Sequence, residues 1–362
     1  MKKIVTVLGA RPQFIKAAAV SRAIATKGQA LTEYIINTGQ HYDYNMSELF
    51  FEELNIPRPH VNLAIGSGSH GAQTGDMMKM IEEQLVKLKP HAVLVYGDTN
   101  STLAGALAAV KIHIPVAHVE AGLRSFNKRM PEEVNRIVTD HVSDFLFVPT
   151  QTGMDNLAKE GIPADKIFRS GDVMYDVVQF YRKKASATSP IVKDLGLTGK
   201  PFVLVTIHRA ENTDDPARLN AIMNSLSEIA KENTIVFPMH PRTRKVLSNI
   251  YKGTIPEQVR IVDPVGYLDM IALQTACLLV ITDSGGVQKE AFMNDKFCIT
   301  TRTETEWTEL VDHGFNFLVN PLDKLAEIFS KVKSMRFDKK DFQPYGDGHA
   351  AEKIVNTIIE KI

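Results

Sequence analysis

The chain has 362 residues, of which 44% are hydrophobic and 23% are charged, and its 42 basic side chains balance 42 acidic ones. This length predicts two domains, each large enough to bury a core of its own. The formal net charge of zero gives no support for a nucleic acid or an anionic membrane surface as partner.

The cysteine content and the hydropathy pattern indicate a cytoplasmic protein. Cys277 and Cys298 both lie in apolar, strand-like surroundings, and two cysteines are too few for a disulfide scaffold or a cysteine-based metal site. No segment approaches the ~20 apolar residues that span a bilayer. The N-terminus lacks the long apolar stretch and the cleavage site of a signal peptide. We therefore expect a cytoplasmic location and no membrane attachment.

Short apolar runs alternate with longer amphipathic segments through the first half of the chain. The runs predict strands at residues 4–8, 34–37, 92–96 and 115–119. The amphipathic segments predict helices at residues 14–27, 46–54, 70–88 and 101–111, and another that opens at Pro131. Aliphatic strands of this length between helices are typical of βαβ units, in which a parallel sheet is covered on both faces.

The same alternation starts again in the second half. Residues 184–200 are rich in Ser, Thr, Pro, Lys and Gly, and we interpret them as an inter-domain or surface segment. Further strands are predicted at residues 202–206, 234–237, 259–262, 278–282 and 297–300. The fold class is therefore α/β, with two doubly wound Rossmann-like domains. Ligands bind beyond the carboxyl ends of the strands in such sheets, so two facing sheets predict a site in the cleft between them.

Acidic residues follow the predicted strands of the first half. Asp98 lies in Gly97-Asp98-Thr99, where capping the next helix is the commoner use of an aspartate. Glu120 ends an otherwise apolar strand, and because an unpaired carboxylate is costly there, a functional role is favoured. Glu132 and Glu133 lie in the first turn of the helix that opens at Pro131. Acids in a first turn interact favourably with the helix dipole, so one of this pair is expected to have no catalytic role.

Basic residues and glycines follow the strands of the second half. His208 follows its first strand, His240-Pro241-Arg242 its second and Ser284-Gly285-Gly286 its fourth. The backbone N–H groups of a Ser-Gly-Gly turn at a helix start can bind a diphosphate, and Glu290 further along that helix can bond ribose hydroxyls. Alone, such a turn is ordinary. Together with the basic side chains and with Arg11, which follows the first strand of the chain, it favours an anion site.

No metal and no NAD are expected. The sequence has neither G-x-G-x-x-G nor a P-loop signature, which removes the main support for NAD and nucleoside-triphosphate enzymes. The histidines that follow strands lack the spacing of a zinc site; they are His41, His118, His208 and His240. The acids that could hold Mg²⁺ lie in separate units with no D-x-D motif; they are Asp98, Asp283 and Glu290.

Eight ordered motifs resemble those of the non-hydrolysing UDP-N-acetylglucosamine 2-epimerases, and the likeness covers nearly the whole chain. The motifs are Gly9-Ala10-Arg11-Pro12, Thr38-Gly39-Gln40-His41, Gly97-Asp98-Thr99, His118-Val119-Glu120-Ala121-Gly122-Leu123-Arg124, Pro131-Glu132-Glu133-Val134-Asn135-Arg136, His208-Arg209-Ala210-Glu211-Asn212, Thr282-Asp283-Ser284-Gly285-Gly286-Val287-Gln288 and Pro344-Tyr345-Gly346-Asp347-Gly348. The eight together are far more specific than any one of them.

The resemblance implies an isomerase with the two-domain glycosyltransferase-B architecture, a homodimer, a UDP-sugar substrate and no cofactor. Residues 1–170, with a C-terminal helix at 346–362 that packs back on them, would form the N-terminal domain, and residues 171–345 the UDP-binding domain. The implied reaction eliminates UDP as the C2 proton is removed, which gives a 2-acetamidoglucal. UDP is then re-added with protonation at C2 from the other face. Such enzymes supply polysaccharide precursors.

The resemblance also assigns site residues. It implies catalytic roles for Asp98, Glu120, Glu132 and His208. It implies UDP-sugar binding by Arg11, Lys16, His41, Arg136, His240, Arg242, Ser284, Gly285, Gly286 and Glu290. Which acid removes the C2 proton and which returns it is left open.

Two departures from the family pattern bear on the substrate and on regulation. Many members carry Thr-Thr-Glu-Arg-Pro-Glu where this chain has Glu304-Thr305-Glu306-Trp307-Thr308-Glu309, which resembles the branch that acts on UDP-2,3-diacetamido-2,3-dideoxyglucuronate. Ala72-Gln73 stands where many bacterial members use an Arg-Gln pair to bind an activating UDP-N-acetylglucosamine. Three other functions stay open: a glycosyltransferase of the same architecture, a hydrolysing epimerase and a catalytically silent nucleotide-sugar binding module.

Overall fold

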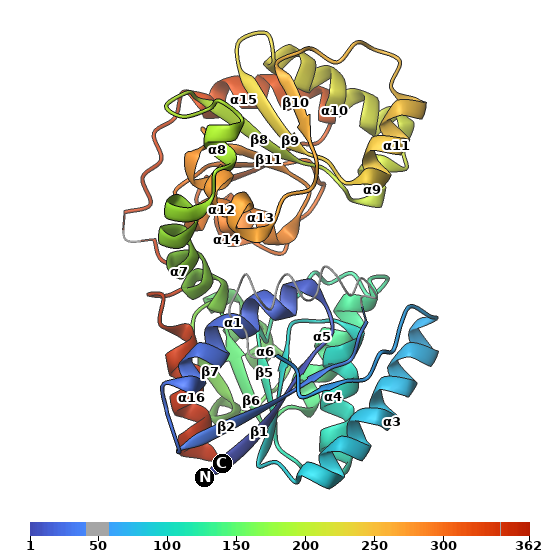
Figure 1. Ribbon diagram of the computed structural model, residues 1–362, viewed down its shortest axis with the longest axis vertical. Coiled ribbons are helices and arrows are strands. Elements are labelled where there is room, and N and C mark those ends of the chain that lie inside the picture. Colours follow the sequence, from blue (N-terminus) through green and yellow to red (C-terminus); the bar gives the residue numbers. More distant parts are fainter. Residues whose placement is uncertain (41–57, 341) are drawn as a thin grey trace. The chain divides into compact units, whose positions relative to one another are not determined.

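The chain divides into two compact units. The computed structural model describes residues 1–40, 58–340 and 342–362. Unit 1 comprises Met1–Val177 and Gln343–Ile362, and unit 2 comprises Val178–Phe342. The domain boundaries expected from the sequence are residues 170 and 345. Each unit consists of a parallel sheet with helices on both faces (Figure 1), as the α/β prediction requires.

Unit 1 is built on a parallel sheet of seven strands in the order β3-β2-β1-β4-β5-β6-β7. The strands are β1 (Lys2–Leu8), β2 (Leu31–Asn37), β3 (Val61–Asn62), β4 (Ala92–Tyr96), β5 (Val116–Val119), β6 (Phe145–Val148) and β7 (Ile167–Arg169). All residues of β4 and β5 are buried, because helices cover both faces of the sheet. From β1 the strand order first runs to one edge of the sheet, through β2 and β3, and then to the other edge, starting with β4. The ends of β1 and β4 therefore lie at the topological switch point.

Helices of unit 1 bury their apolar sides against this sheet. They are α1 (Arg11–Ala25), α3 (His70–Leu88), α4 (Asn100–Lys111), α5 (Pro131–Val142), α6 (Gln151–Lys159), the 3₁₀ turn Ala164–Lys166, the start of α7 (Val173–Thr188) and α16 (Ala350–Lys361). Met77, Ile81 and Leu85 recur at helical spacing on α3 and are fully buried against the sheet.

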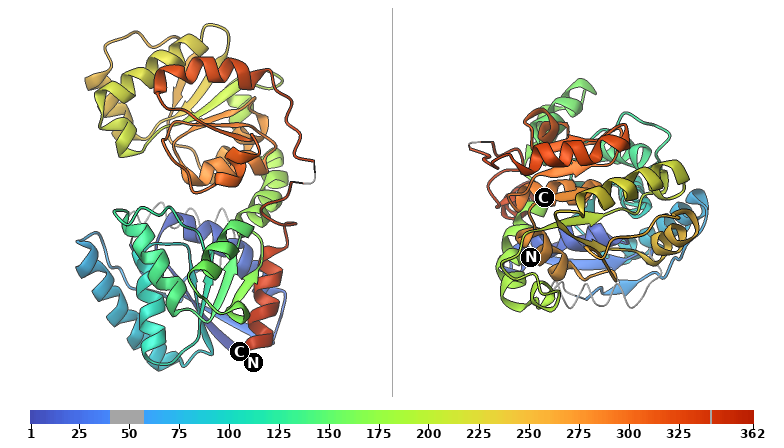
Figure 2. Two further views of the ribbon diagram at one scale, coloured as in Figure 1. Left: turned by 180° about the vertical axis from the view of Figure 1, so that it is seen from behind. Right: turned by 90° about the horizontal axis from the view of Figure 1, so that it is seen from above.

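The last helix, α16, belongs to unit 1 although the whole of unit 2 precedes it in the chain. It packs against α1, and Lys2 Nζ donates to the carbonyl oxygen of Ile359 at 2.6 Å, so the two chain ends lie side by side (Figures 1 and 2). Asp176 accepts the first backbone N–H groups of α16, from Ala350 and Ala351, at 3.1 and 2.9 Å. Burial raises the pKa of Asp176 to about 6.

Unit 2 repeats the doubly wound pattern with a parallel sheet of six strands in the order β10-β9-β8-β11-β12-β13. The strands are β8 (Phe202–Thr206), β9 (Thr234–Pro238), β10 (Val259–Val262), β11 (Val280–Thr282), β12 (Cys298–Thr300) and β13 (Asn316–Leu318). The helices are α8 (Ile191–Asp194), α9 (Ala210–Thr213), α10 (Pro216–Ile229), α11 (Pro241–Ile250), α12 (Tyr267–Ala276), α13 (Gly285–Met293), α14 (Thr308–Asp312) and α15 (Leu325–Lys333), with a 3₁₀ turn at Leu322–Lys324.

Both cysteines are core residues of unit 2, as the sequence predicts. Cys277 and Cys298 are both buried, and each is a free cysteine. Burial raises the pKa of each thiol to about 12, which keeps both in the neutral form.

Of the two alternatives for residues 184–200, the surface segment is confirmed, since nearly all of these residues are exposed or half-buried, and the inter-domain segment is wrong. The long helix α7 runs on to Thr188 and α8 follows at Ile191–Asp194, so the segment starts inside a helix and lies within unit 2. The chain instead passes between the units inside α7, at Val177, and again at Phe342. The helix predicted at 46–54 lies outside the described residues. In the described ranges, no helix has the length and apolar character that crossing a membrane requires.

Candidate active site

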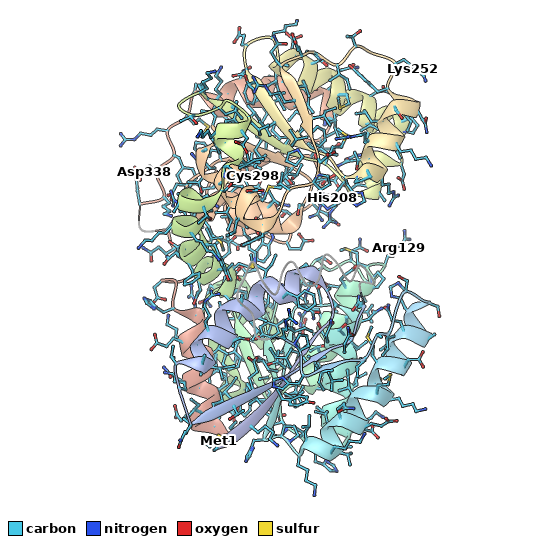
Figure 3. The ribbon with its side chains drawn as sticks, viewed as in Figure 1. Met1, Arg129, His208, Lys252, Cys298 and Asp338 are labelled. Carbon is cyan, nitrogen blue, oxygen red and sulfur yellow. The ribbon has the colours of Figure 1, made fainter. Side chains whose placement is uncertain are left out.

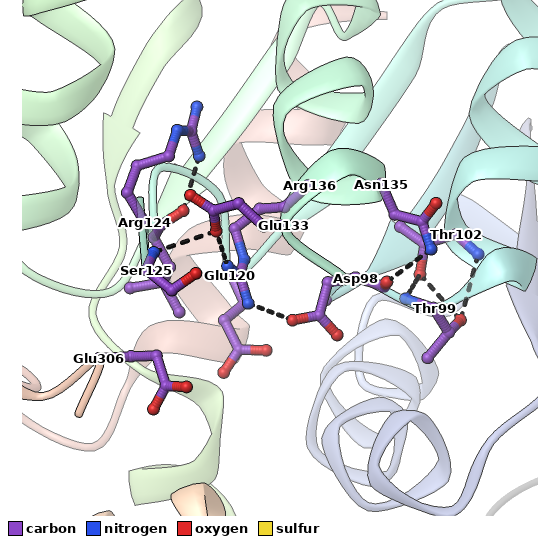
Figure 4. Close-up of polar contacts among 12 residues, drawn as sticks. Asp98, Thr99, Thr102, Glu120, Arg124, Ser125, Glu133, Asn135, Arg136 and Glu306 are labelled. Carbon is purple, nitrogen blue, oxygen red and sulfur yellow. Dashed lines mark hydrogen bonds and ion pairs between the residues drawn. The ribbon is translucent and has the colours of Figure 1, made fainter. Parts of the chain in front are cut away.

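Asp98 lies in the turn that follows β4, where Gly97 adopts a φ of 64°. The helix after this turn is capped by Thr99, whose hydroxyl accepts the N–H of Thr102, so the alternative use of Asp98 as a cap is excluded. The Asp98 carboxylate is 30% exposed and forms an ion pair with Arg136 of α5 (Figure 4). Because Asp98 does not cap the helix and is partly exposed, its carboxylate can take part in proton transfer.

Arg136 holds two carboxylates at once. Its second terminal nitrogen donates to Glu133 at 2.5 Å. Burial opposes the charge of this arginine, but the neighbouring Asp98 and Glu133 outweigh it and raise the pKa of Arg136 above its ordinary value. A permanently charged guanidinium therefore fixes the Asp98 carboxylate in place.

Glu133 and Glu132 differ in environment although both lie in the first turn of α5. Glu133 is fully buried, and besides Arg136 it accepts the backbone N–H groups of Ser125 and Phe126 at 3.0 and 2.9 Å. Glu132 is exposed. Glu133 is thus the structural member of the pair, and Glu132 keeps its carboxylate in contact with solvent.

Glu120 occupies the end of β5 in a left-handed conformation, with a φ of 74°. Non-glycine residues rarely adopt this conformation, and such strain is concentrated at functional sites. Its carboxylate is 10% exposed and forms an ion pair with Lys16 of α1, whose side chain is 11% exposed. The pair lies against Gly97, because a Cβ there would stand 3.2 Å from Lys16 Nζ and 3.3 Å from Glu120 Oε2. Lys16 and Glu120 are therefore placed directly beside the Asp98 turn.

The turn between β1 and α1 is stabilised by hydrogen bonds to the side chain of Gln13. The Gln13 side chain is buried, and its carbonyl oxygen accepts the N–H groups of Gly9 and Ala10 at 2.8 and 3.0 Å. Gly9 is required because a Cβ would lie 2.1 Å from the hydroxyls of Thr38 and Ser101. These two N–H groups are thus occupied by the protein, so an anion at this turn depends on the side chains. The Arg11 side chain and His41 lie outside the described part of the structure.

In unit 2, the end of β8 is fixed by Asp283. This residue follows β11, is fully buried, and accepts the backbone N–H of His208 at 3.0 Å, that of Arg209 at 3.0 Å and the Asn212 amide at 3.1 Å. The His208 side chain, labelled in Figure 3, is 53% exposed. Its Nδ1 lies 3.3 Å from Asp283 Oδ1. The sequence analysis considered Asp283 as a Mg²⁺ ligand, which it did not favour, and missed this role, which depends on two loops that meet at the sheet edge.

The Ser284-Gly285-Gly286 turn opens α13, with Ser284 as the N-cap. A Cβ on Gly286 would meet no atom within 4 Å, and the nearest atom to one on Gly285 is Glu306 Oε2 at 3.6 Å. The first N–H groups of a helix have no partner inside the helix, and the helix dipole favours an anion beside them. The backbone of this turn therefore presents an open surface suited to a diphosphate.

The loop around residue 306 packs beside this turn. Trp307 Nε1 donates to the carbonyl oxygen of Gly285 at 3.0 Å, and Lys289 Nζ lies 4.0 Å from the Trp307 ring centroid. Glu306 forms a bidentate ion pair with Arg302, at 3.1 and 3.2 Å. Burial would raise the pKa of Glu306, but Arg302 and Arg209 outweigh it and lower that pKa. The residue that departs from the wider family, Trp307, thus lies against the predicted diphosphate turn.

Three other predicted binding residues of unit 2 have protein partners. Glu290 is 7% exposed and accepts the Gln274 amide at 2.8 Å. His240 caps α11 through Nδ1, which accepts the N–H of Arg242 at 3.2 Å. The exposed Arg242 side chain forms an ion pair with Asp214 at 2.9 Å. A ligand that uses Arg242 therefore has to compete with Asp214.

The arrangement can move protons and hold an anion. Unit 1 places two carboxylates, Asp98 and Glu120, at the ends of the adjacent strands β4 and β5, each beside a cation. Unit 2 places a half-exposed histidine and an open helix start at the ends of β8 and β11. Among the residues that the structure describes, no three His, Cys, Asp or Glu side chains cluster as a metal site.

The fold and these strand-end groups define an α/β enzyme with two doubly wound units. The chain belongs to the UDP-N-acetylglucosamine 2-epimerase family, whose model matches residues 23–359, and it is accordingly an isomerase. It is 53% identical to the UDP-2,3-diacetamido-2,3-dideoxy-D-glucuronate 2-epimerase of Pseudomonas aeruginosa, over 97% of this chain and 98% of that one. It is 43% identical to the UDP-N-acetylglucosamine 2-epimerase of Methanocaldococcus jannaschii, over 98% of each chain.

Solved structures agree with this assignment. The crystal structure of the Methanocaldococcus jannaschii UDP-GlcNAc 2-epimerase in complex with UDP-GlcNAc and UDP matches with a TM-score of 0.89 and 42% identity, over 99% of this chain and 100% of that one. A glycosyltransferase from Rickettsia africae matches with a TM-score of 0.55 at 16% identity, over 98% of this chain and 93% of that one; this shows a shared fold and nothing more. The glycosyltransferase-B architecture expected from the sequence is thereby confirmed.

Proposed function

We propose that the protein inverts C2 of an N-acetylated UDP-sugar without hydrolysing it, by eliminating UDP to a 2-acetamidoglucal and then adding UDP back. The observation that carries the proposal is the placement of Asp98 and Glu120 at adjacent strand ends, each ion-paired to a cation. No carbonyl group acidifies the C2 hydrogen, so the enzyme has to stabilise the departing UDP while a positioned carboxylate takes the proton. Ser284, Gly285, Gly286 and His208 suit the first task.

Two sugars are candidates. UDP-N-acetylglucosamine is the substrate named for most of the relatives, including those of known structure. UDP-2,3-diacetamido-2,3-dideoxyglucuronate is named for the relative at 53% identity, and the loop with Trp307 against Gly285 favours it. The epimerisation chemistry is the same for both, because both carry the diphosphate on C1 and an acetamido group on C2 and differ only at C3 and C6.

Proton NMR of each UDP-sugar with the enzyme in D₂O tests the proposal. We expect a 2-epimer that carries deuterium at C2, because a carboxylate that has taken the proton exchanges it with solvent before returning it. The same incubation after exhaustive EDTA treatment and without NAD should proceed at an unchanged rate, since we propose that neither is used. Release of free sugar and UDP would instead identify a hydrolysing epimerase. An unchanged UDP-sugar that reacts only after an acceptor is supplied would identify a glycosyltransferase.

The assembly and location are part of the same proposal. We propose a homodimer in the cytoplasm that supplies polysaccharide precursors, in keeping with the family and with the buried, neutral thiols of Cys277 and Cys298. Light scattering should give about twice the mass of one chain. A monomer that is fully active would remove the dimer from the proposal.

Binding of UDP to unit 2 is testable without turnover. A ligand at a hundredfold excess over its Kd stabilises the folded state by about 2.7 kcal/mol, so UDP should raise the Tm measurably. Gly285→Val should abolish this shift, because branched methyl groups would cover the turn, whereas the free protein should still fold since a Cβ there meets nothing nearer than 3.6 Å. Gly75→Ala, on α3 where a Cβ meets open space, is the matched control. An undiminished UDP-induced Tm shift in Gly285→Val would show that the diphosphate does not bind at this turn.

A further inference from the structure

His118 is a fully buried histidine of β5 for which the proposed chemistry has no use. Its Nε2 lies 2.7 Å from the carbonyl oxygen of Gly97, the residue before Asp98. Its Nδ1 lies 2.7 Å from Asp140 Oδ1, on α5. Both ring nitrogens therefore have an oxygen partner, at ordinary hydrogen-bond distance and out of contact with water.

The partners determine the protonation of the ring. A backbone carbonyl oxygen only accepts hydrogen bonds, and so does an ionised carboxylate. Asp140 receives two further donors on its second oxygen, the N–H of Gly122 at 3.1 Å and the guanidinium of Arg124 at 2.7 Å. Burial would raise the pKa of Asp140, but the bond from His118 and the charge of Arg124 outweigh it and lower that pKa. Asp140, which also accepts the charged guanidinium of Arg124 and the N–H of Gly122, therefore presents an acceptor to Nδ1, as the Gly97 carbonyl does to Nε2.

A doubly protonated ring fits the charges around it. Behind Asp140, Arg124 makes a bidentate ion pair with Glu160 at 2.7 and 2.6 Å. The chain of contacts from His118 through Asp140 and Arg124 to Glu160 thus alternates cation and anion and is balanced overall. Buried charges are tolerated where each is paired and hydrogen-bonded in this way.

The network ends on two turns, in each of which a glycine has a positive φ. At one end the His118 ring holds the carbonyl of Gly97, which has a φ of 64°. At the other end, Asp140 holds the N–H of Gly122, which has a φ of 81° and follows Glu120 by two residues. Glycine adopts a positive φ at no steric cost, so each turn is held in place by the hydrogen bonds of the network and carries no strain of its own. A single buried histidine ring therefore connects the turn that carries Asp98 with the turn that carries Glu120.

We propose that His118 is a positioning residue that, as an imidazolium between Gly97 and Asp140, sets the separation of Asp98 and Glu120. The proposal rests on the proposed role of these two acids at C2 of the sugar. His118 itself touches no substrate in this account. It acts through the backbone of one turn and through the carboxylate that holds the other.

Two amide variants separate the two bonds of the ring. In His118→Gln the amide nitrogen reaches about as far as Nε2, so the bond to the Gly97 carbonyl is retained. In His118→Asn it reaches about as far as Nδ1, so only the bond to Asp140 is retained. A misplaced acid costs on the order of 10²-fold, so we expect kcat to fall roughly 10–100-fold in His118→Asn and markedly less in His118→Gln, with KM and the UDP-induced Tm shift nearly unchanged in both.

His91→Gln, which alters an exposed histidine just before β4, is the control and should keep full kcat. Equal losses of kcat in the two His118 variants, or a loss confined to KM or to Tm, would overturn the positioning role. If wild type converts neither UDP-sugar, the proposed function fails, whereas the bond pattern is still measured by the following experiment.

Nitrogen-15 NMR of histidine-labelled protein reads the ring directly. In wild type we expect two protonated nitrogens for His118 at neutral pH. In Asp140→Asn the amide oxygen should turn toward Arg124 and Gly122, so the NH₂ group faces Nδ1 and the ring becomes neutral with hydrogen on Nε2 alone. A neutral His118 ring in wild type, or a ring unaffected by Asp140→Asn, would contradict the proposal whatever the activity of the enzyme.

Discussion

Glu120→Gln is expected to lower kcat by roughly 10²–10⁴-fold, the usual contribution of an acid–base group. The substitution keeps the shape of the side chain but removes the charge that pairs with Lys16, so the proton at C2 loses its acceptor or its source. Asp98→Asn should lower kcat by a similar factor. Arg136 keeps Glu133 as an ion-pair partner in that variant, so its charge is not left unpaired. Steady-state kinetics with either UDP-sugar measures the loss, and the Tm shift with UDP should persist in both variants.

The same series locates Glu132. The family resemblance assigns it to catalysis, and the structure leaves its carboxylate exposed, so Glu132→Gln should lose rate as well. Glu82→Gln, an exposed glutamate on α3, is the control and should keep full activity. If one stage of the reaction fails before the other, the glycal and UDP accumulate, which NMR would detect. Near-normal rates in all three acid variants would remove these acids from the mechanism.

Gly122→Ala is expected to destabilise the fold by about 2–5 kcal/mol, which combines the cost of a left-handed alanine with that of overpacking. Gly122 has a φ of 81°, and a Cβ there would stand 2.5 Å from the carbonyl oxygen of Gly153 in α6. Backbone in a helix cannot turn aside as a flexible side chain can, so the loop or the helix has to shift. Urea or thermal unfolding of the free protein measures the change.

Gly161→Ala separates the two costs. Gly161 follows α6 with a φ of 79°, and a Cβ there meets nothing within 4 Å. Only the conformational cost of about 1–2 kcal/mol should remain. Equal destabilisation in the two variants would mean that the approach of Gly122 to Gly153 is unimportant.

Long apolar runs made the fold class predictable. Ala92–Tyr96 is a continuous run of apolar residues, Phe202–Thr206 is apolar up to its last residue, and both are buried strands. The three-residue strands Ile167–Arg169 and Asn316–Leu318 escaped prediction, because so few residues show no period. Phe145–Val148 was missed although it is as long as strands that were predicted. The composition of residues 184–200 indicated a surface segment correctly, but it could not exclude a linker, since polar residues on the exposed side of α7 resemble one when the helix that carries them is not seen.

The site was predictable where the motif itself carries the geometry. The placement of Asp98, Glu120, His208 and the Ser284–Gly286 turn at strand ends follows from the alternation of strands and helices. The partners were not predictable, because Lys16 lies 104 residues from Glu120 and Asp283 lies 75 from His208, and only the sheet order brings them together. One signal was available: Glu133 and Arg136 are three residues apart, a spacing that places them on one face of a helix.

The return of α16 to unit 1 reverses the order in which the two units are completed during synthesis. Unit 2 is one continuous stretch, Val178–Phe342, whereas unit 1 needs Gln343–Ile362 as well. As the chain leaves the ribosome from its N-terminus, the later unit has all its residues first. Until α16 emerges, α1 lacks the helix that packs against it. The side chains that α16 buries, which include Ile354, Val355 and Ile358, are not yet in place. A nascent chain in that interval exposes an apolar seam, which makes it a target for chaperones and a risk for aggregation.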